Sequence, residues 1–144
     1  IDRLTRIFGL ATPLRRAIDG GLPVLGTCAG LIMLADRLAN PAPGQQTLGG
    51  LEITVERNAF GSQRDSFDTT VTVAGVGNID ASFIRAPIVT EIGDGVDVIA
   101  TLPDGRVVGV RAGNLMGISF RPEVAGDSRV HAAFIRSIAE NGHI

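Results

Sequence analysis

Apolar residues at helical spacing mark both ends of this 144-residue chain. In the first twenty residues they fall every three or four positions and stop at glycines, which predicts two short helices. The first carries Leu4, Ile7 and Phe8, and the second begins at Thr12-Pro13 and carries Leu14, Ala17 and Ile18. The same spacing returns after Asp127 or Ser128, either of which can cap a last helix with Val130, Phe134, Ile135 and Ile138 facing inward.

Between these helices the pattern is typical of strands. Short apolar runs and alternating apolar and polar residues are separated by turns rich in glycine, proline and polar residues. The predicted strands are 24–25, 51–56, 67–73, 81–84, 96–102, 106–110 and 114–120, with a loop at 40–50 and a hairpin turn at 103–105. This order of elements predicts an α/β domain with a mixed sheet.

One cysteine lies where a predicted strand meets a predicted helix. The segment 26–30, Gly-Thr-Cys-Ala-Gly, follows the strand, and a helix is predicted from Gly30 to Leu38. Small residues on both sides of Cys28 allow a sharp turn that sets its side chain above a helix N-terminus, where a thiolate is favoured. Cys28 is therefore a candidate nucleophile, and the alternative is a buried cysteine that packs as a small apolar side chain.

Composition and charge narrow the classes of function. A net charge of −2 gives no reason to expect binding to nucleic acid or to an acidic membrane surface. No apolar run is long enough to span a membrane. A single cysteine rules out an intrachain disulfide and agrees with a cytoplasmic protein.

A cysteine nucleophile needs a base, which is usually a histidine. His131 lies in the predicted last helix and His143 lies near the C-terminus. Both are interpreted as ordinary surface residues, because neither is at a strand end, where the active sites of sheet proteins form. The segment Arg121-Pro122-Glu123 does follow a strand end.

Taken together, the cysteine segment and Arg121-Pro122-Glu123 resemble class I glutamine amidotransferases, whose triad combines a cysteine on a sharp turn with a later His-Pro-Glu. The segments 57–67, 83–87 and 127–131 resemble more narrowly the glutaminase subunits of pyridoxal 5′-phosphate synthase. The resemblance covers almost the whole chain. It implies one glutamine amidotransferase domain over residues 1–144, a flavodoxin-like three-layer sandwich with a mixed, mostly parallel sheet.

The resemblance also implies the catalytic residues. Cys28 would attack the side-chain amide of glutamine, Glu123 would be the triad acid, and the backbone N–H of Ala29 would donate to the oxyanion. Arg121 stands at the family's histidine position. An arginine stays protonated and has no acceptor nitrogen, so it cannot take the thiol proton, although its charge can favour a thiolate. We therefore expect hydrolysis weakened by a factor of about 10²–10⁴ or more.

Substrate-binding residues follow from the same resemblance. Arg57, Ile84 and Arg85 match positions that hold glutamine, and a guanidinium suits this role because it pairs with a carboxylate through two bonds. Without the resemblance, the two arginines could equally be solvated charges at strand ends, and Asn58 and Gln63 polar loop residues. The resemblance implies no cofactor and no metal.

A second departure from the family concerns the N-terminus. The family's Gly-Gly-Glu-Ser loop and the opening strand–helix–strand region are absent from the sequence, which starts at Ile1 inside a predicted helix. We expect the domain to be N-terminally incomplete in this sequence, because a sheet without its first strand would expose unpaired edges.

The function expected from the resemblance is that of a glutaminase subunit. It would hydrolyse L-glutamine and pass the ammonia to the lyase subunit of pyridoxal 5′-phosphate synthase. The alternative, prompted by Arg121, is a non-catalytic subunit of the same complex that binds glutamine or serves in docking. A third interpretation is another amidotransferase or hydrolase built on a cysteine turn.

Overall fold

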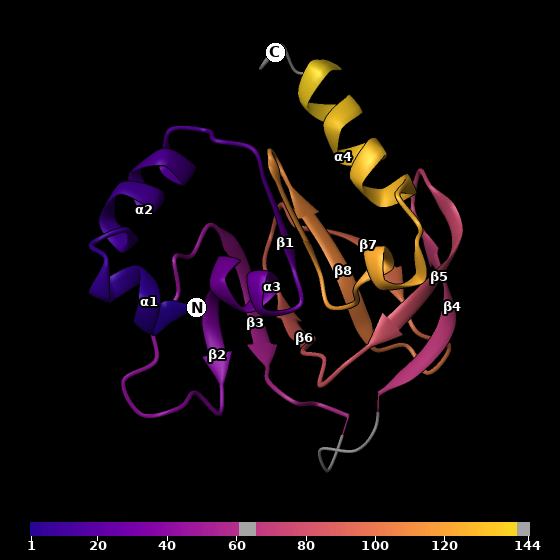
Figure 1. Ribbon diagram of the computed structural model, residues 1–144, viewed down its shortest axis with the longest axis horizontal. Helices are drawn as coiled ribbons and strands as arrows, with labels where there is room; N and C mark the ends of the chain where they lie inside the picture. Colours follow the sequence, from indigo (N-terminus) through magenta and orange to yellow (C-terminus); the bar gives the residue numbers. More distant parts are fainter. Residues whose placement is uncertain (61–65, 141–144) are drawn as a thin grey trace.

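The computed structural model describes residues 1–60 and 66–140, and in it helices pack around a mixed sheet (Figure 1). The helices are α1 (Asp2–Ile7), α2 (Ala11–Asp19), α3 (Ala29–Leu34) and α4 (Arg129–Glu140), with a short 3₁₀ helix, η1 (Pro122–Ala125). Helices α1 and α2 lie together at one side of the molecule, and α4 lies at the other side (Figure 1).

The strands of the described residues form one sheet. They are β1 (Val24–Thr27), β2 (Ala35–Ala39), β3 (Leu51–Glu56), β4 (Phe67–Val73), β5 (Gly77–Phe83), β6 (Ile88–Ile92), β7 (Asp97–Thr101), β8 (Val107–Ala112) and β9 (Leu115–Ile118). The order is β2-β3-β6-β8-β7-β4-β5, and β9 pairs with both β8 and β1.

The mixed α/β sheet is as predicted, but the balance of its pairings is not. Among the described residues, β1–β9 and β2–β3 are parallel, and the other six pairings are antiparallel. The resemblance implied a mostly parallel sheet. Short turns join β4 to β5, β7 to β8 and β8 to β9, and a short turn can only return the chain antiparallel.

Strand β9 lies between two helical layers. Side chains alternate between the faces of a strand. A side chain at Gly117 would come within 2.5 Å of Leu31 of α3, whereas the neighbouring Met116 shares a buried cluster with Val130 of α4. Helices α3 and α4 therefore cover opposite faces of the sheet, which gives the three-layer arrangement that the resemblance implied.

Close packing of α3 on β1 depends on one glycine. A β-carbon at Gly26 would lie 2.6 Å from the carbonyl carbon of Gly30 and 2.8 Å from Leu34. The backbone of α3 cannot move away without losing its contact with the strand. By contrast, a β-carbon at Gly30 would meet nothing within 4 Å. Of these two glycines, only Gly26 is required by packing.

Two segments differ from the sequence-based prediction. The predicted helix from Gly30 to Leu38 ends at Leu34, and the following residues form β2, which pairs with β3. Pairing with a neighbouring strand satisfies the backbone of these residues and overrides their helical propensity. Strand β6 was not predicted, because its apolar run is short and follows Pro87 directly.

Smaller differences concern element ends. Helix α2 begins at Ala11, so Thr12 and Pro13 lie within its first turn, where a missing N–H costs no helical bond. Strand β5 begins at Gly77, four residues before its predicted start. Ile135, predicted to face inward, is 56% exposed, while Val130 is fully buried as predicted. The other predicted elements are present.

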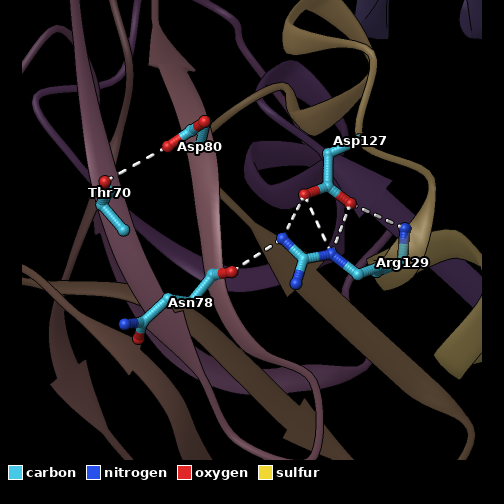
Figure 2. A network of polar contacts seen from close by, with 5 residues as sticks. All are labelled: Thr70, Asn78, Asp80, Asp127 and Arg129. Atoms are coloured by element: carbon cyan, nitrogen blue, oxygen red, sulfur yellow. Dashed lines mark hydrogen bonds and ion pairs between the residues drawn. The ribbon is translucent and has the colours of Figure 1, made fainter.

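A polar clamp ties the start of α4 to β5 (Figure 2). The Arg129 guanidinium donates to both carboxylate oxygens of Asp127, at distances from 2.6 to 3.1 Å, and to the Asn78 carbonyl at 2.7 Å. The Arg129 N–H donates to Asp127 as well, at 2.9 Å. The hydrogen bonds from the Arg129 side chain, and after them the one from its backbone N–H, hold the pKa of Asp127 below its usual value. The hydrogen bonds to Asp127 in turn raise the pKa of Arg129.

We predict that Gly26→Ala destabilises the protein severely, since the new methyl group meets backbone that cannot move aside. The expected loss in the free energy of unfolding is about 3 kcal/mol or more, measured by urea denaturation. Gly30→Ala is the matched control and should be neutral or stabilising by about 0.5–1 kcal/mol, because alanine suits a helix interior. Equal losses in the two variants would contradict this account of the packing.

We predict that the clamp weakens in acid. Because the pKa of Asp127 is lowered in the folded state, its contribution is present above the unfolded pKa, near 3.8, and is lost as the pH falls through the folded pKa. Asp127→Asn should be less stable than the wild type at pH 7, and thermal melts should show the gap closing in acid. Arg129→Gln should lose at least as much stability, because it also removes the bond to the Asn78 carbonyl, and adding Asp127→Asn to it should cost nothing further; additive losses would refute the clamp.

Candidate active site

The turn from β1 to α3 places Cys28 in a strained backbone conformation. Its φ is 50° and its ψ is −106°, which a residue other than glycine adopts only when its surroundings enforce it. The Cys28 N–H donates to the Ile118 carbonyl of β9 at 2.8 Å, and the Cys28 carbonyl accepts from the Leu31 N–H at 3.1 Å. The sharp turn predicted from the sequence is therefore present and is held from both sides.

The thiol of Cys28 is nearly covered. The residue is 9% exposed, and its Sγ lies 3.9 Å from the carbonyl oxygen of Ile84, to which the S–H can donate weakly. Burial alone would suit a cysteine that only packs. The positive φ is what distinguishes this residue, because a cysteine that only filled space would need no strained turn.

Several predicted site residues come together at one edge of the sheet. Strands β1 and β9 are parallel, with Thr27 beside Ile118, so both chains leave the sheet at the same edge. Three residues after Ile118, the Arg121 N–H donates to the Ser82 carbonyl of β5 at 3.0 Å. Two residues after Ser82 comes Ile84, whose carbonyl faces the thiol. The loops after β1, β5 and β9 thus meet around Cys28.

Phenylalanines beneath this edge anchor three of its loops. Phe83, fully buried, directly precedes Ile84, and its ring lies 5.6 Å from Phe120, which directly precedes Arg121. Phe60, which follows the Arg57 segment, lies 5.7 Å from Phe83 between ring centroids. Rings at these separations attract each other beyond simple burial. The loops that carry predicted site residues therefore share one aromatic support.

Arg57 and Ala29 line one hollow of about 250 Å³ beside the cysteine turn. Arg57 directly follows β3 and is half-buried, and its Nη1 donates to Oε1 of Gln45 at 2.8 Å. Gln45 lines the same hollow. Sequence reasoning missed this glutamine, since it lies in a loop of proline, glycine and polar residues and belongs to no recognisable pattern.

Ile84 and Arg85 do not line that hollow. Ile84 is 41% exposed, and Arg85 is exposed with a φ of 47°. Their segment is tied to the Arg57 segment by a bond from the Ala59 N–H to the Ala86 carbonyl, at 3.3 Å. Gln63 lies outside the described residues.

Arg121 and Glu123 are exposed at the start of η1. In the described part of the chain, no hydrogen bond or ion pair joins either of them to Cys28. Glu123 lines a second hollow, of about 330 Å³, together with His131 and Asp127. The histidine that sequence reasoning assigned to the open surface is thus half-buried beside the predicted triad acid.

The described residues contain no group of three or more His, Cys, Asp or Glu side chains placed to hold a metal ion. None of their helices has the length and apolar character needed to cross a bilayer.

Comparison with known proteins identifies the family of this chain. The model of the SNO glutamine amidotransferase family matches residues 1–140. Pyridoxal 5′-phosphate synthase subunit PdxT of Cutibacterium acnes is 52% identical over 97% of this chain and 73% of its own length. The protein of the same name from Corynebacterium glutamicum strain R is 55% identical, over 97% of this chain and 72% of its own length.

Solved structures agree as well. A crystal structure of a glutamine amidotransferase superposes with a TM-score of 0.86 at 42% identity, covering 94% of this chain and 71% of that one. A glutamine amidotransferase from Thermotoga maritima, only 14% identical, has a TM-score of 0.55 and shares the fold. With a family model that matches nearly its whole length and relatives above 50% identity, this chain belongs to the SNO glutamine amidotransferase family.

Proposed function

We propose that this protein is a glutaminase subunit that releases ammonia from L-glutamine through Cys28. The observation that carries the proposal is the strained turn at Cys28, next to the hollow lined by Ala29 and Arg57. Strain of this kind persists only where the surrounding structure enforces it, and such positions cluster at active sites. Family membership supports the amide of glutamine as the group that the thiol attacks.

In the binding step, the α-carboxylate of glutamine pairs with the Arg57 guanidinium, which is suited to hold a carboxylate. The side-chain amide then extends toward Cys28. Ile84 and Arg85 close the other side of the thiol, where the Ile84 carbonyl already lies 3.9 Å from Sγ.

In the chemical steps, Sγ of Cys28 attacks the amide carbon and the carbonyl oxygen becomes an oxyanion. The Ala29 N–H is suited to donate to this oxygen, because the first N–H of a helix has no partner within the helix. When the C–N bond breaks, the nitrogen leaves as ammonia with the proton that the thiol has lost. Water then attacks the γ-glutamyl thioester, which releases glutamate and restores the thiol.

Proton transfer is the step that Arg121 impairs. At this position a histidine would accept the thiol proton and return it to the leaving nitrogen, and a guanidinium can do neither. Its charge can favour the thiolate, and Glu123 can pair with that charge. The chain should therefore form the thioester slowly.

The relatives' printed name supports a partner and a pathway. They are subunits of pyridoxal 5′-phosphate synthase, so we propose that this chain also docks on the synthase (lyase) subunit and delivers ammonia to it. A reactive thiol that must stay reduced favours the cytoplasm as the compartment.

A second candidate function follows from Arg121. Without a base, the protein would bind glutamine and dock on the synthase but would turn over no substrate. It would then act as a regulatory or docking subunit of the same complex.

We predict that Cys28→Ala abolishes ammonia release. The assay measures ammonia formed from L-glutamine with the synthase subunit present. Thermal melts should show that the variant is folded, since alanine fits the space of the thiol. Equal rates for Cys28→Ala and the wild type would remove Cys28 from the mechanism, and no release by either would favour the non-catalytic alternative.

We predict that Arg121→His raises the rate of glutamine hydrolysis by about 10²–10⁴, the usual contribution of a general acid–base residue. Arg121→Gln is the matched control, because it removes the charge without supplying a base, and it should not raise the rate. If Arg121→His leaves the rate at the wild-type value, the lack of a base at residue 121 is not what limits this chain.

A further inference from the structure

A second polar side chain, that of Gln45, lines the hollow beside Arg57, and its hydrogen bonds fix the orientation of its amide. Oε1 of Gln45 accepts from Nη1 of Arg57 at 2.8 Å and from the Ala42 N–H at 3.0 Å. An amide oxygen accepts two hydrogen bonds, so both of its sites are used. The other end of the same amide, Nε2, therefore carries two N–H donors, and neither is paired in the part of the chain that the structure describes.

The loop that carries Gln45 is fastened to the helices around it. The Met33 carbonyl at the end of α3 accepts from the N–H groups of Leu48 and Gly49, at 2.8 and 3.1 Å. Arg15 of α2 donates to the Thr47 carbonyl at 2.6 Å. A loop held at several points presents its side chains in a defined place, as a binding site requires.

Helix α1 also holds this loop. Asp2 accepts from the Gln46 N–H at 3.1 Å and is bound through both oxygens by Arg6, at 2.9 Å each. The Gln46 N–H, and then the Arg6 side chain, lower the pKa of Asp2, so it is an anion at neutral pH. Asp2 also lines the hollow.

The polar groups of the hollow are mostly hydrogen-bond donors. Arg57 and Arg3 contribute guanidinium groups and Gln45 is left with amide donors, whereas the oxygens of Asp2 are already bound by Arg6 and the Gln46 N–H. A carboxylate, which only accepts hydrogen bonds, is complementary to this lining.

We propose that Gln45 is a substrate-binding residue whose Nε2 donates to the α-carboxylate of glutamine, beside the Arg57 guanidinium. This inference rests on the function proposed above and adds to it a residue that discriminates L-glutamine from amides without a carboxylate. The Arg57–Gln45 bond orients both side chains before the substrate arrives, which lowers the entropy cost of binding.

The test measures L-glutamine binding by calorimetry in the full chain carrying Cys28→Ser, which prevents turnover. Gln45→Glu keeps an oxygen for both Arg57 and Ala42 but replaces the N–H donors with a negative charge. We expect it to weaken L-glutamine binding at least about tenfold, as for loss of a hydrogen bond to a charged group. Gln46→Glu is the matched control: it makes the same charge change on the neighbouring exposed residue and should alter the affinity less than about twofold.

A second ligand tests the contact itself. 4-Aminobutanamide is glutamine without its α-carboxylate, and its affinity can be measured by the same titration. The penalty from Gln45→Glu should disappear for this ligand. An equal penalty for both ligands would overturn the inference, because Gln45 would then act on something other than the carboxylate.

A third variant separates binding from loop support. Gln45→Ala removes the acceptor for Arg57 and Ala42 and the donors for substrate together. If Gln45→Ala loses affinity and Gln45→Glu restores it, Gln45 only supports the loop and the inference fails. If the chain with Gln45 intact binds no L-glutamine, the proposed function fails; if it binds and Gln45→Glu binds equally well, only the inference fails.

Discussion

The hydrogen bond from the Cys28 N–H to the Ile118 carbonyl is the constraint on which the site depends. It extends the β1–β9 ladder by one residue, just where the chain must turn into α3. The cysteine therefore cannot relax into an ordinary backbone conformation without breaking the ladder. Because Arg121 follows the same strand, the bond also fixes where the loop after β9 starts relative to the thiol.

Further contacts position the segments that surround this turn and those that lead away from it. Gly26 lets α3 approach β1 closely. The packed rings of Phe83 and Phe120 anchor the loops after β5 and β9 to the core. The clamp between Asp127 and Arg129 fixes the start of α4. Gly26 and the two phenylalanines act at the edge of the sheet where Cys28 lies, whereas the clamp binds Asn78 at the opposite end of β5. The Phe120–Arg129 stretch is thus held at both ends, even though its site residues are exposed.

Local sequence patterns were enough to predict the turn and most of the sheet. The residues that produce the turn, Gly26 and Cys28, lie within a few positions of each other and of the apolar runs around them. A local pattern is therefore enough to predict it. Residues 35–38 were mispredicted as helix because the strand partner of β2, β3, lies after an eleven-residue loop. Gln45 could not be identified either, since the role proposed for it depends on Arg57 and Ala42 and on a loop held by three helices. Long-range pairing, which single-sequence patterns do not contain, accounts for both failures.

The near-complete cover over the Cys28 sulfur bears on how long the enzyme survives in a cell. Oxidation of a cysteine to sulfenic and higher acids depends on exposure as well as on thiolate character. Cys28 is 9% exposed and a carbonyl lies beside its sulfur, so peroxide has a narrow approach. Glutamine differs from peroxide because contacts to its α-carboxylate end can direct its side-chain amide to the sulfur. The same cover that makes the thiol resemble a packing residue thus protects its reactivity from irreversible damage.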